Sequence, residues 1–186
     1  MSTRSATKPP ELASIERTRW RIDPARSSIE FRTLTFWGLM MVKGTFDRYE
    51  GTLDLEDDPA IELKIEAASL DTNNKKRDAH LRSADFFDAE NHPQVRFVSE
   101  SAMLSGEHLK SRGRLYAAGQ SMPLDLEATV QRVDGELQVD STAYVDYYAL
   151  GMSHGRLGMI QPPAELIVRA RLVQGAEHEI ETSQPG

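Results

Sequence analysis

The chain has 186 residues, a formal net charge of -7 and no cysteine. A chain of this length buries enough surface for one core, so a single domain is expected. The acidic balance argues against nucleic acid as a partner, and the lack of thiols excludes disulfides, thiolate catalysis and cysteine-ligated zinc.

Both ends of the chain are polar. Residues 1–16 carry prolines and no apolar run of the length that a secretory signal needs, and residues 175–186 are acidic and polar. Both segments are expected to be flexible, which leaves 17–174 as the folded domain. No later stretch approaches the roughly 20 apolar residues of a membrane-spanning helix. The sequence therefore predicts a cytoplasmic protein without a membrane span.

Apolar and polar residues alternate with period two along most of the chain, which places successive side chains on opposite faces of a strand. Ile61, Leu63 and Ile65, for example, alternate with glutamate and lysine. Turn residues separate the alternating segments, as in a series of short antiparallel strands. The expected strands are 19–22, 28–35, 42–55, 61–67, 95–103, 109–117, 124–130, 137–145 and 166–172.

Two local signals refine this pattern. The apolar parity changes between Phe46 and Tyr49, so a β-bulge is expected near Asp47–Arg48. Asp134–Gly135 is a strong two-residue hairpin signal. The predicted fold class is mainly β, either a barrel or a sandwich, and the long alternating strands favour an extended antiparallel barrel of about eight strands.

Residues 69–93 interrupt the strand pattern. The run Asn74–Ser83 is long enough for two turns of helix, with Leu81 as its main apolar side chain. We expect this short helical insertion to form a lid or plug at one end of the barrel. Arg77 and His80 within it are donors that suit the polar end of an amphiphile. The alternative is structural, with Arg77 and the aspartate after it pairing with backbone groups of the connection.

Two further segments are candidates for a ligand site. The stretch Phe36–Met41 gathers aromatic, leucine and methionine side chains around Gly38, and such side chains adapt well to a long alkyl chain. A filled core uses the same residue types, so composition leaves both interpretations open. The connection 149–163 is longer than a usual hairpin loop and either borders the mouth of a cavity or is an exposed excursion.

The sequence contains few signs of catalysis. Its five histidines show no metal-ligand spacing, and it contains no nucleophile elbow, Walker-type phosphate loop or dinucleotide fingerprint. Isolated histidines are more often exposed or structural. The sequence therefore predicts neither an enzyme nor a bound metal or other cofactor.

A set of short motifs runs in order along the chain, within a stretch from about Trp20 to Val173. The set comprises Trp20–Phe31, Val42–Phe46 with Tyr49 and Gly51, Ser69–Thr72, Arg77–Phe87, His92–Phe97, Gly113–Gly119, and Leu150-Gly-Met152 with Leu157-Gly-Met159. Their order and spacing resemble the YceI-like family. The resemblance implies a lipocalin-like antiparallel barrel with a helical insertion, an elongated cavity that binds polyisoprenoids or other long amphiphiles, and no established enzymatic activity.

The resemblance also implies site residues and a possible homodimer. The chain departs from the family pattern at two places. The cavity wall would include Phe31, Phe36, Trp37, Phe46, Leu63, Phe97 and Leu115 from strands, His80, Leu81 and Phe86 from the insertion, and Leu150 and Met152 near the last loop. Arg77, His80 and His154 are the headgroup candidates. The chain lacks the histidine that many relatives carry shortly after Phe31, and Tyr147–Tyr148 stand where an arginine is common. Both departures point to a changed headgroup preference.

The leading hypothesis is a carrier or sequestering protein for a polyisoprenoid, an isoprenoid quinone, or a fatty amide or acid. A second is an enzyme that acts on such a ligand, with His80 or His154 beside a carboxylate. The third is a barrel with a filled core that serves protein interaction. A continuous internal void would count against the third hypothesis, and a densely packed interior would favour it.

Overall fold

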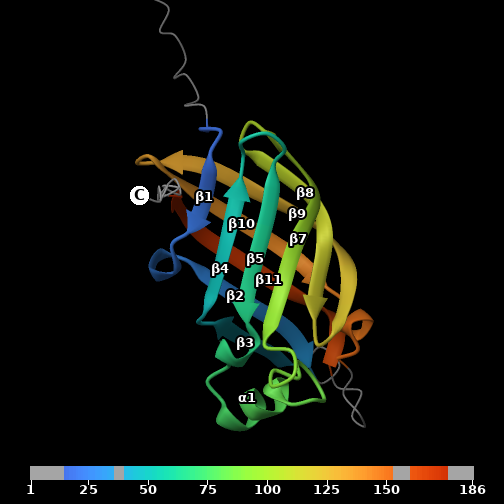
Figure 1. Cartoon of the computed structure of the whole chain (residues 1–186). Helices are drawn as coiled ribbons and strands as arrows, with labels where there is room; N and C mark the ends of the chain where they lie inside the picture. Colours follow the sequence, from blue (N-terminus) through green and yellow to red (C-terminus); the bar gives the residue numbers. More distant parts are fainter. Residues whose placement is uncertain (1–14, 36–39, 153–159, 176–186) are drawn as a thin grey trace, which may run out of the picture.

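The structure is a computed structural model that describes residues 15–35, 40–152 and 160–175. Its eleven strand segments form one antiparallel sheet that closes on itself (Figure 1). Closure occurs because β1 pairs with β4 on one side and with β11 on the other. The closed ring contains eight strands, as predicted: β1 (Arg19–Ile22), β4 (Tyr49–Asp54), β5 (Ala60–Glu66), β7 (Gln94–Ser105), β8 (His108–Ala117), β9 (Gln120–Val133), β10 (Glu136–Val145) and β11 (Ile160–Gln174).

The other three strands continue the wall beside the first part of β11. β2 (Ser28–Thr35) pairs with β11, β3 (Met40–Phe46) pairs with β2, and β6 (Leu70–Asp71) pairs with β3. Each of these three strands is separated from a ring strand next to it in sequence by only a short break in the chain. The 3-10 helix η1 (Pro24–Arg26) separates β1 from β2, and η2 (Ala67–Ser69) separates β5 from β6.

The third interruption lies at Asp47–Arg48, where the sequence predicts a β-bulge within one strand; the structure instead has a break between two strands, β3 and β4. Ser69 of η2 accepts hydrogen bonds from the backbone N–H groups of both residues at this break. The Asp47 N–H donates to the Ser69 carbonyl at 3.2 Å, and the Arg48 N–H donates to the Ser69 hydroxyl at 3.1 Å. The break therefore leaves neither N–H unpaired.

The predicted insertion forms helix α1 (Lys75–Arg82), which covers one end of the barrel (Figure 1). Asn74 caps it by accepting from the Arg77 N–H at 3.1 Å. The buried Asp78 carboxylate accepts from the Thr72 N–H at 3.0 Å and from the Thr72 hydroxyl at 2.5 Å. Among the described residues, no helix has the length and hydropathy that crossing a membrane requires.

The hairpin turns follow from residues that accept a positive φ. Asp134 and Gly135 have φ values of 56° and 82° and join β9 to β10, as predicted. Ala118 and Gly119 make a similar turn between β8 and β9. β11 begins at Ile160, earlier than expected, so the connection after the 3-10 helix η3 (Tyr147–Leu150) is shorter than the sequence suggests.

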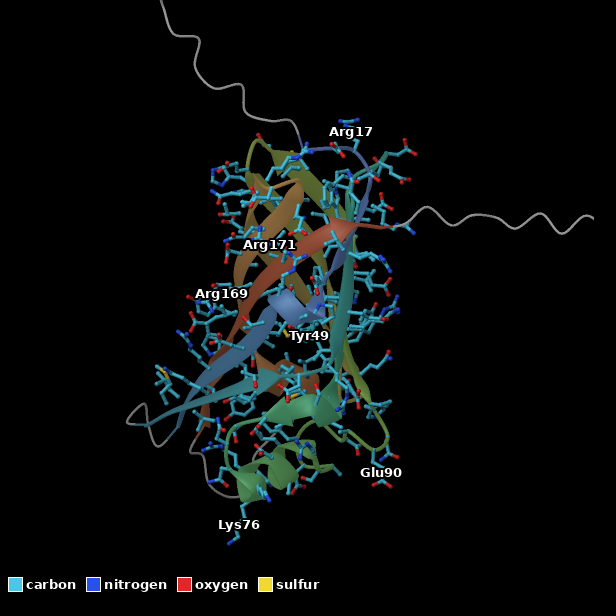
Figure 2. All side chains as sticks on the ribbon, turned by 90° about the vertical axis from the view of Figure 1, so that its left-hand side faces the viewer. Arg17, Tyr49, Lys76, Glu90, Arg169 and Arg171 are labelled. Atoms are coloured by element: carbon cyan, nitrogen blue, oxygen red, sulfur yellow. The ribbon has the colours of Figure 1, made fainter. Side chains whose placement is uncertain are left out.

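Apolar side chains point into the barrel and ion pairs cover its outside, where Figure 2 shows the charged side chains. One apolar cluster includes Leu81 of α1 and lies toward that end of the barrel. The other surrounds Trp20 toward the opposite end. On the outer face, Arg169 lies 3.0 Å from Glu30. Most strands thus keep the division that the alternation predicts, and Ile167, which is buried on the outer parity of β11, is an exception.

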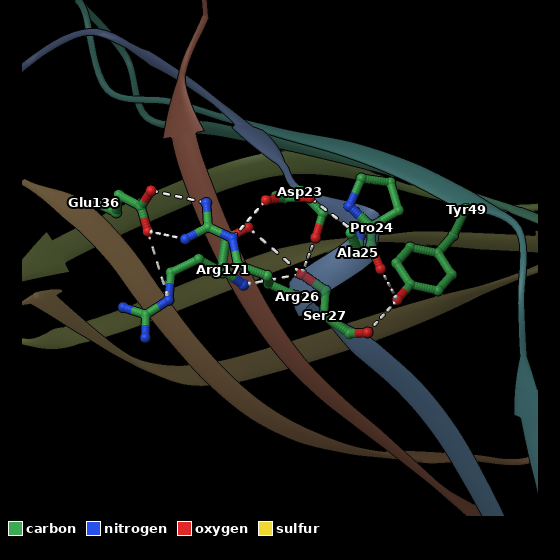
Figure 3. Close-up of polar contacts among 8 residues, drawn as sticks. All are labelled: Asp23, Pro24, Ala25, Arg26, Ser27, Tyr49, Glu136 and Arg171. Carbon is green, nitrogen blue, oxygen red and sulfur yellow. Dashed lines mark hydrogen bonds and ion pairs between the residues drawn. The ribbon is translucent and has the colours of Figure 1, made fainter.

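Side-chain contacts fasten η1 to the barrel wall (Figure 3). The Arg26 guanidinium donates to both carboxylate oxygens of Glu136, on β10, at 2.8 Å each and to Asp23 at 2.6 Å. These hydrogen bonds lower the pKa of Asp23 and of Glu136 below the ordinary values of those carboxyls. η1 is thereby tied to β10 across β11.

Backbone and hydroxyl contacts complete this attachment. The Ser27 hydroxyl accepts from the Arg171 N–H of β11 at 2.9 Å. On the other side, the Tyr49 hydroxyl of β4 donates to the Ser27 carbonyl at 2.6 Å (Figure 3). η1 therefore connects β11 and β4 at the place where the strand hydrogen bonds are interrupted between β1 and β2.

Replacing Glu136 with glutamine is expected to flatten the acid limb of the stability profile. The folded-state pKa of Glu136 is lowered, so its contribution is complete above the ordinary value of 4.5 and is lost as pH falls through the lowered value. Urea unfolding between about pH 3 and pH 7 measures this dependence. Glu90→Gln, at an exposed carboxyl after α1, is the control. Equal acid limbs in wild type and Glu136→Gln would contradict the role of this ion pair.

Candidate ligand-binding cavity

An internal cavity of about 100 Å³ lies within the closed ring. Twenty-two residues line it, and all eight ring strands contribute at least one of them. Eighteen are apolar, mostly leucine, isoleucine, valine and alanine at the inward positions of the strands. Leu63, Leu126 and Val168 line the cavity yet are only half-buried, because the interior is not filled around them.

The few polar groups in the cavity wall are largely engaged elsewhere. The Ser111 hydroxyl donates to the Ser101 carbonyl at 3.1 Å, and the Ser141 hydroxyl donates to the Glu127 carbonyl at 2.8 Å. Glu62 also borders the cavity, and its carboxylate pairs with Arg96 at 2.9 Å. The cavity therefore presents an apolar surface suited to a hydrocarbon.

A row of aromatic rings closes the barrel at the α1 end. Its contacts run from Phe31 to Phe46 (ring centroids 5.5 Å apart), Phe46 to Phe87 (6.0 Å), Phe87 to Phe86 (5.2 Å) and Phe86 to Tyr147 (5.8 Å). The buried side chains of Leu81, Leu150 and Met152 belong to the same apolar cluster. None of these five rings lines the cavity.

Two buried hydroxyls at the α1 end lack hydrogen-bond partners. Tyr147 is 3 % exposed and lies beside Thr33 of β2 and beside Tyr148. Within the described residues, neither Tyr147 Oη nor Thr33 Oγ1 has a partner in hydrogen-bonding geometry. Burial is the main cause that raises the pKa of Tyr147 to about 12, so its proton is held at neutral pH.

At the end of the barrel near Trp20, the polar side chains have hydrogen-bond or ion-pair partners. Trp20 is fully buried, and its indole N–H donates to the Glu16 carbonyl at 3.3 Å. Arg132, at the same end, pairs with the Glu16 carboxylate at 2.8 Å. The polar side chains of Trp20 and Arg132 are therefore satisfied within the protein.

The site residues implied by the resemblance fall into four groups. Leu63, Phe97 and Leu115 line the cavity. Phe31, Phe46, Leu81, Phe86, Leu150 and Met152 lie in the apolar cluster toward α1. His80 is exposed on α1, and Arg77 donates to Thr72 Oγ1 at 2.8 Å and to the Thr72 carbonyl at 2.7 Å. Phe36, Trp37 and His154 lie outside the described residues, so their roles stay predictions.

Much of the cavity wall was not among those site residues. It includes Leu109, Leu124, Val139, Leu166 and Leu172. The sequence does contain the signal, because these positions alternate with polar ones and mark the dry faces of strands. Alternation alone does not distinguish a dry face that packs from one that borders a void. As for metals, the described ranges contain no group of three or more histidine or acidic side chains that could hold an ion.

The sequence matches the profile of the YceI-like domain over residues 20–171. Protein YceI of Escherichia coli O157:H7 is 38% identical over 95 residues, which cover 49% of this chain and 50% of that protein. UPF0312 protein plu2095 of Photorhabdus laumondii is 37% identical over the same length and coverage. The chain thus spans about half the length of these curated relatives.

Solved structures share the barrel. Burkholderia cenocepacia BcnA superposes with a TM-score of 0.73 at 18% identity, covering 81% of this chain and 98% of that one. A polyisoprenoid binding domain from Saccharophagus degradans gives 0.70 at 13% identity, covering 84% and 98%. The Campylobacter jejuni YCEI protein gives 0.59 at 24% identity, covering 73% and 86%. At these identities the similarity establishes the fold.

Proposed function

The chain belongs to the YceI-like domain family, and from that premise we propose that its barrel binds the hydrocarbon part of a long apolar or amphiphilic ligand, as a carrier or sequestering protein. The observation that carries the proposal is the apolar cavity inside the closed ring, bordered by every ring strand. Its two serine hydroxyls already donate to backbone carbonyls, so binding energy comes from burial of apolar surface.

The size of the cavity bears on the length of the ligand. Its volume of about 100 Å³ accommodates about seven to ten water-sized groups, or about two isoprene units. Burying that many groups contributes about 8 kcal/mol, and association costs about 4 kcal/mol or more, so such a short guest would bind with a Kd near 1 mM. Tight binding therefore requires a longer chain and side-chain movements that lengthen the cavity.

A polyisoprenoid chain is the ligand class that we favour. Among proteins with the same fold, the Saccharophagus degradans domain is described as polyisoprenoid binding. Leucine, isoleucine and valine side chains of the wall give it an apolar surface that suits a branched hydrocarbon chain. An isoprenoid quinone or a fatty amide or acid would use the same wall and differ at its polar end.

A barrel that serves protein interaction is the second candidate. The modest cavity volume favours it, since an interior that stays nearly filled has little room for a guest. Exposed Tyr144 and Met103, at 63% and 62% exposure, are apolar surface that a partner could cover.

Extraction of the purified protein with organic solvent, followed by mass spectrometry, tests the proposal. We expect a long-chain apolar molecule that is depleted from a variant with a filled cavity, Ala143→Trp, purified in the same way. Added four-unit isoprenoids should also bind the extracted, refolded wild type. Absence of any co-purifying lipid together with failure of added isoprenoids to bind would overturn the proposal and favour the interaction barrel.

A further inference from the structure

The two unpartnered hydroxyls at the α1 end call for a physical explanation. Buried polar side chains in folded proteins are nearly always hydrogen-bonded, because an unpaired one loses its contacts with water and gains nothing in return. Tyr147 Oη and Thr33 Oγ1 are exceptions that lie near enough to interact with one another but not in hydrogen-bonding geometry, although β2 and η3 are far apart in sequence. An oxygen placed between two such neighbours would complete the hydrogen bonds of both.

Strand register places both hydroxyls beyond the same end of the cavity. On β10, Ala143 lines the cavity, Val145 is the next inward position and Tyr147 follows it. On the neighbouring strands, Leu166 lines the cavity and pairs with Phe31, and Thr33 is the next position on the same face of β2. A chain that lengthens the cavity toward α1 therefore reaches Tyr147 and Thr33.

We propose that Tyr147 Oη and Thr33 Oγ1 form a headgroup subsite, which takes a neutral oxygen-bearing group such as an alcohol or a carbonyl at the end of the ligand chain. This inference rests on the proposed function, since it assumes that the barrel binds a long apolar chain. The chain would run from the subsite past Phe31 and Val145 into the cavity, with its far end toward Trp20.

The chemistry of the two hydroxyls matches such a group. The Tyr147 O–H keeps its proton and donates, and the Thr33 hydroxyl donates or accepts as needed. One alcohol or carbonyl oxygen has two lone pairs and can therefore serve both hydroxyls.

An anionic group fits this place less well. Asp146 precedes Tyr147 and contributes to the rise in the pKa of that phenol. Arg32, next to Thr33, lies 3.5 Å from Glu30 and 3.9 Å from Glu165, so carboxylates already balance its charge. A buried diphosphate would need a cation beside it. The subsite therefore selects neutral headgroups over diphosphates.

Three probes with the same four-unit isoprenoid chain test the subsite: geranylgeraniol, its diphosphate and the parent hydrocarbon. Their affinities are measured by displacement of a fluorescent apolar reporter. In the wild type we expect the alcohol to bind about tenfold more tightly than the hydrocarbon or the diphosphate, the equivalent of about 1.4 kcal/mol. Tyr147→Phe should remove the preference for the alcohol and leave the affinity for the hydrocarbon unchanged.

Tyr144→Phe is the matched control, because Tyr144 lies on β10 and is 63% exposed. Tyr147→Phe keeps the ring and deletes only an unpaired hydroxyl, so its melting temperature without ligand should equal or exceed that of the wild type. Equal affinity for alcohol and hydrocarbon, in both wild type and Tyr147→Phe, would overturn the subsite and leave the proposed function intact. Failure of all three probes to bind the wild type would refute the proposed function itself.

Discussion

Replacing Ala143 with tryptophan is expected to weaken binding of a four-unit isoprenoid by about a hundredfold or more, the equivalent of about 3 kcal/mol. Ala143 is 5 % exposed, lines the cavity from β10 and pairs with Leu166, another lining residue. An indole at this position would occupy the space that the hydrocarbon needs. Displacement of a fluorescent apolar reporter measures the loss.

Thr142→Trp provides the control for this variant. Thr142 is one residue away on the same strand, but it is exposed and faces the outside of the barrel. The control introduces the same side chain and should leave the affinity within about twofold of wild type, because the outer face does not contact the guest. Circular dichroism and thermal melting verify that both variants fold. Wild-type affinity in a folded Ala143→Trp protein would mean that the ligand lies elsewhere.

Replacing Gly113 with alanine is expected to lower the free energy of unfolding by about 3 kcal/mol, an effect near the upper end for one added methyl group. A Cβ at Gly113 would meet the Val98 carbonyl oxygen, and it would lie 2.7 Å from Phe97 Cζ and 2.8 Å from Ser99 Cα. Two of these three atoms belong to the backbone, so relief requires β7 and β8 to separate. Urea unfolding measures the loss.

Gly135→Ala separates this steric effect from the cost of losing a glycine. Nothing lies within 4 Å of a Cβ at Gly135, but its φ is +82°, so alanine there costs about 1–2 kcal/mol of backbone strain. Gly113→Ala should be clearly more destabilising than this control. A smaller loss at Gly113 would mean that the strands tolerate a wider separation than their register indicates.

Local sequence patterns were sufficient to predict most of the architecture. Alternation located nine strand segments, Asp134–Gly135 predicted the β9–β10 hairpin, and the run Asn74–Ser83 predicted α1. The start of β11 was missed because Pro162 and Pro163 interrupt the alternation. Proline cannot donate to a ladder, and the register between β11 and β2 shifts between Gln161 and Glu165 to accommodate both.

The site was less predictable than the fold. Phe97 and Leu115 line the cavity, whereas Phe46 and Leu150, which belong to the same apolar cluster, do not. A residue's type and strand parity are the same in both places, so sequence could not separate them. Gly113 carried a local signal, since glycine inside a strand often marks a close approach of backbones. The identity of its neighbour, Val98, depended on the register shift in β7 between Ser99 and Ser101.

The sequence by itself determined which face of each strand is apolar, because the side-chain period of a strand is fixed by its backbone. Only the tertiary structure decided that these faces surround a cavity. Closure depends on β1 pairing with β11, from opposite ends of the chain, and on η1 bridging the interruption beside them. A second long-range pairing, that of β2 with β11, brings Thr33 beside Tyr147. Local patterns do not encode the curvature that leaves space between apolar faces, so the cavity emerges only when the ring closes.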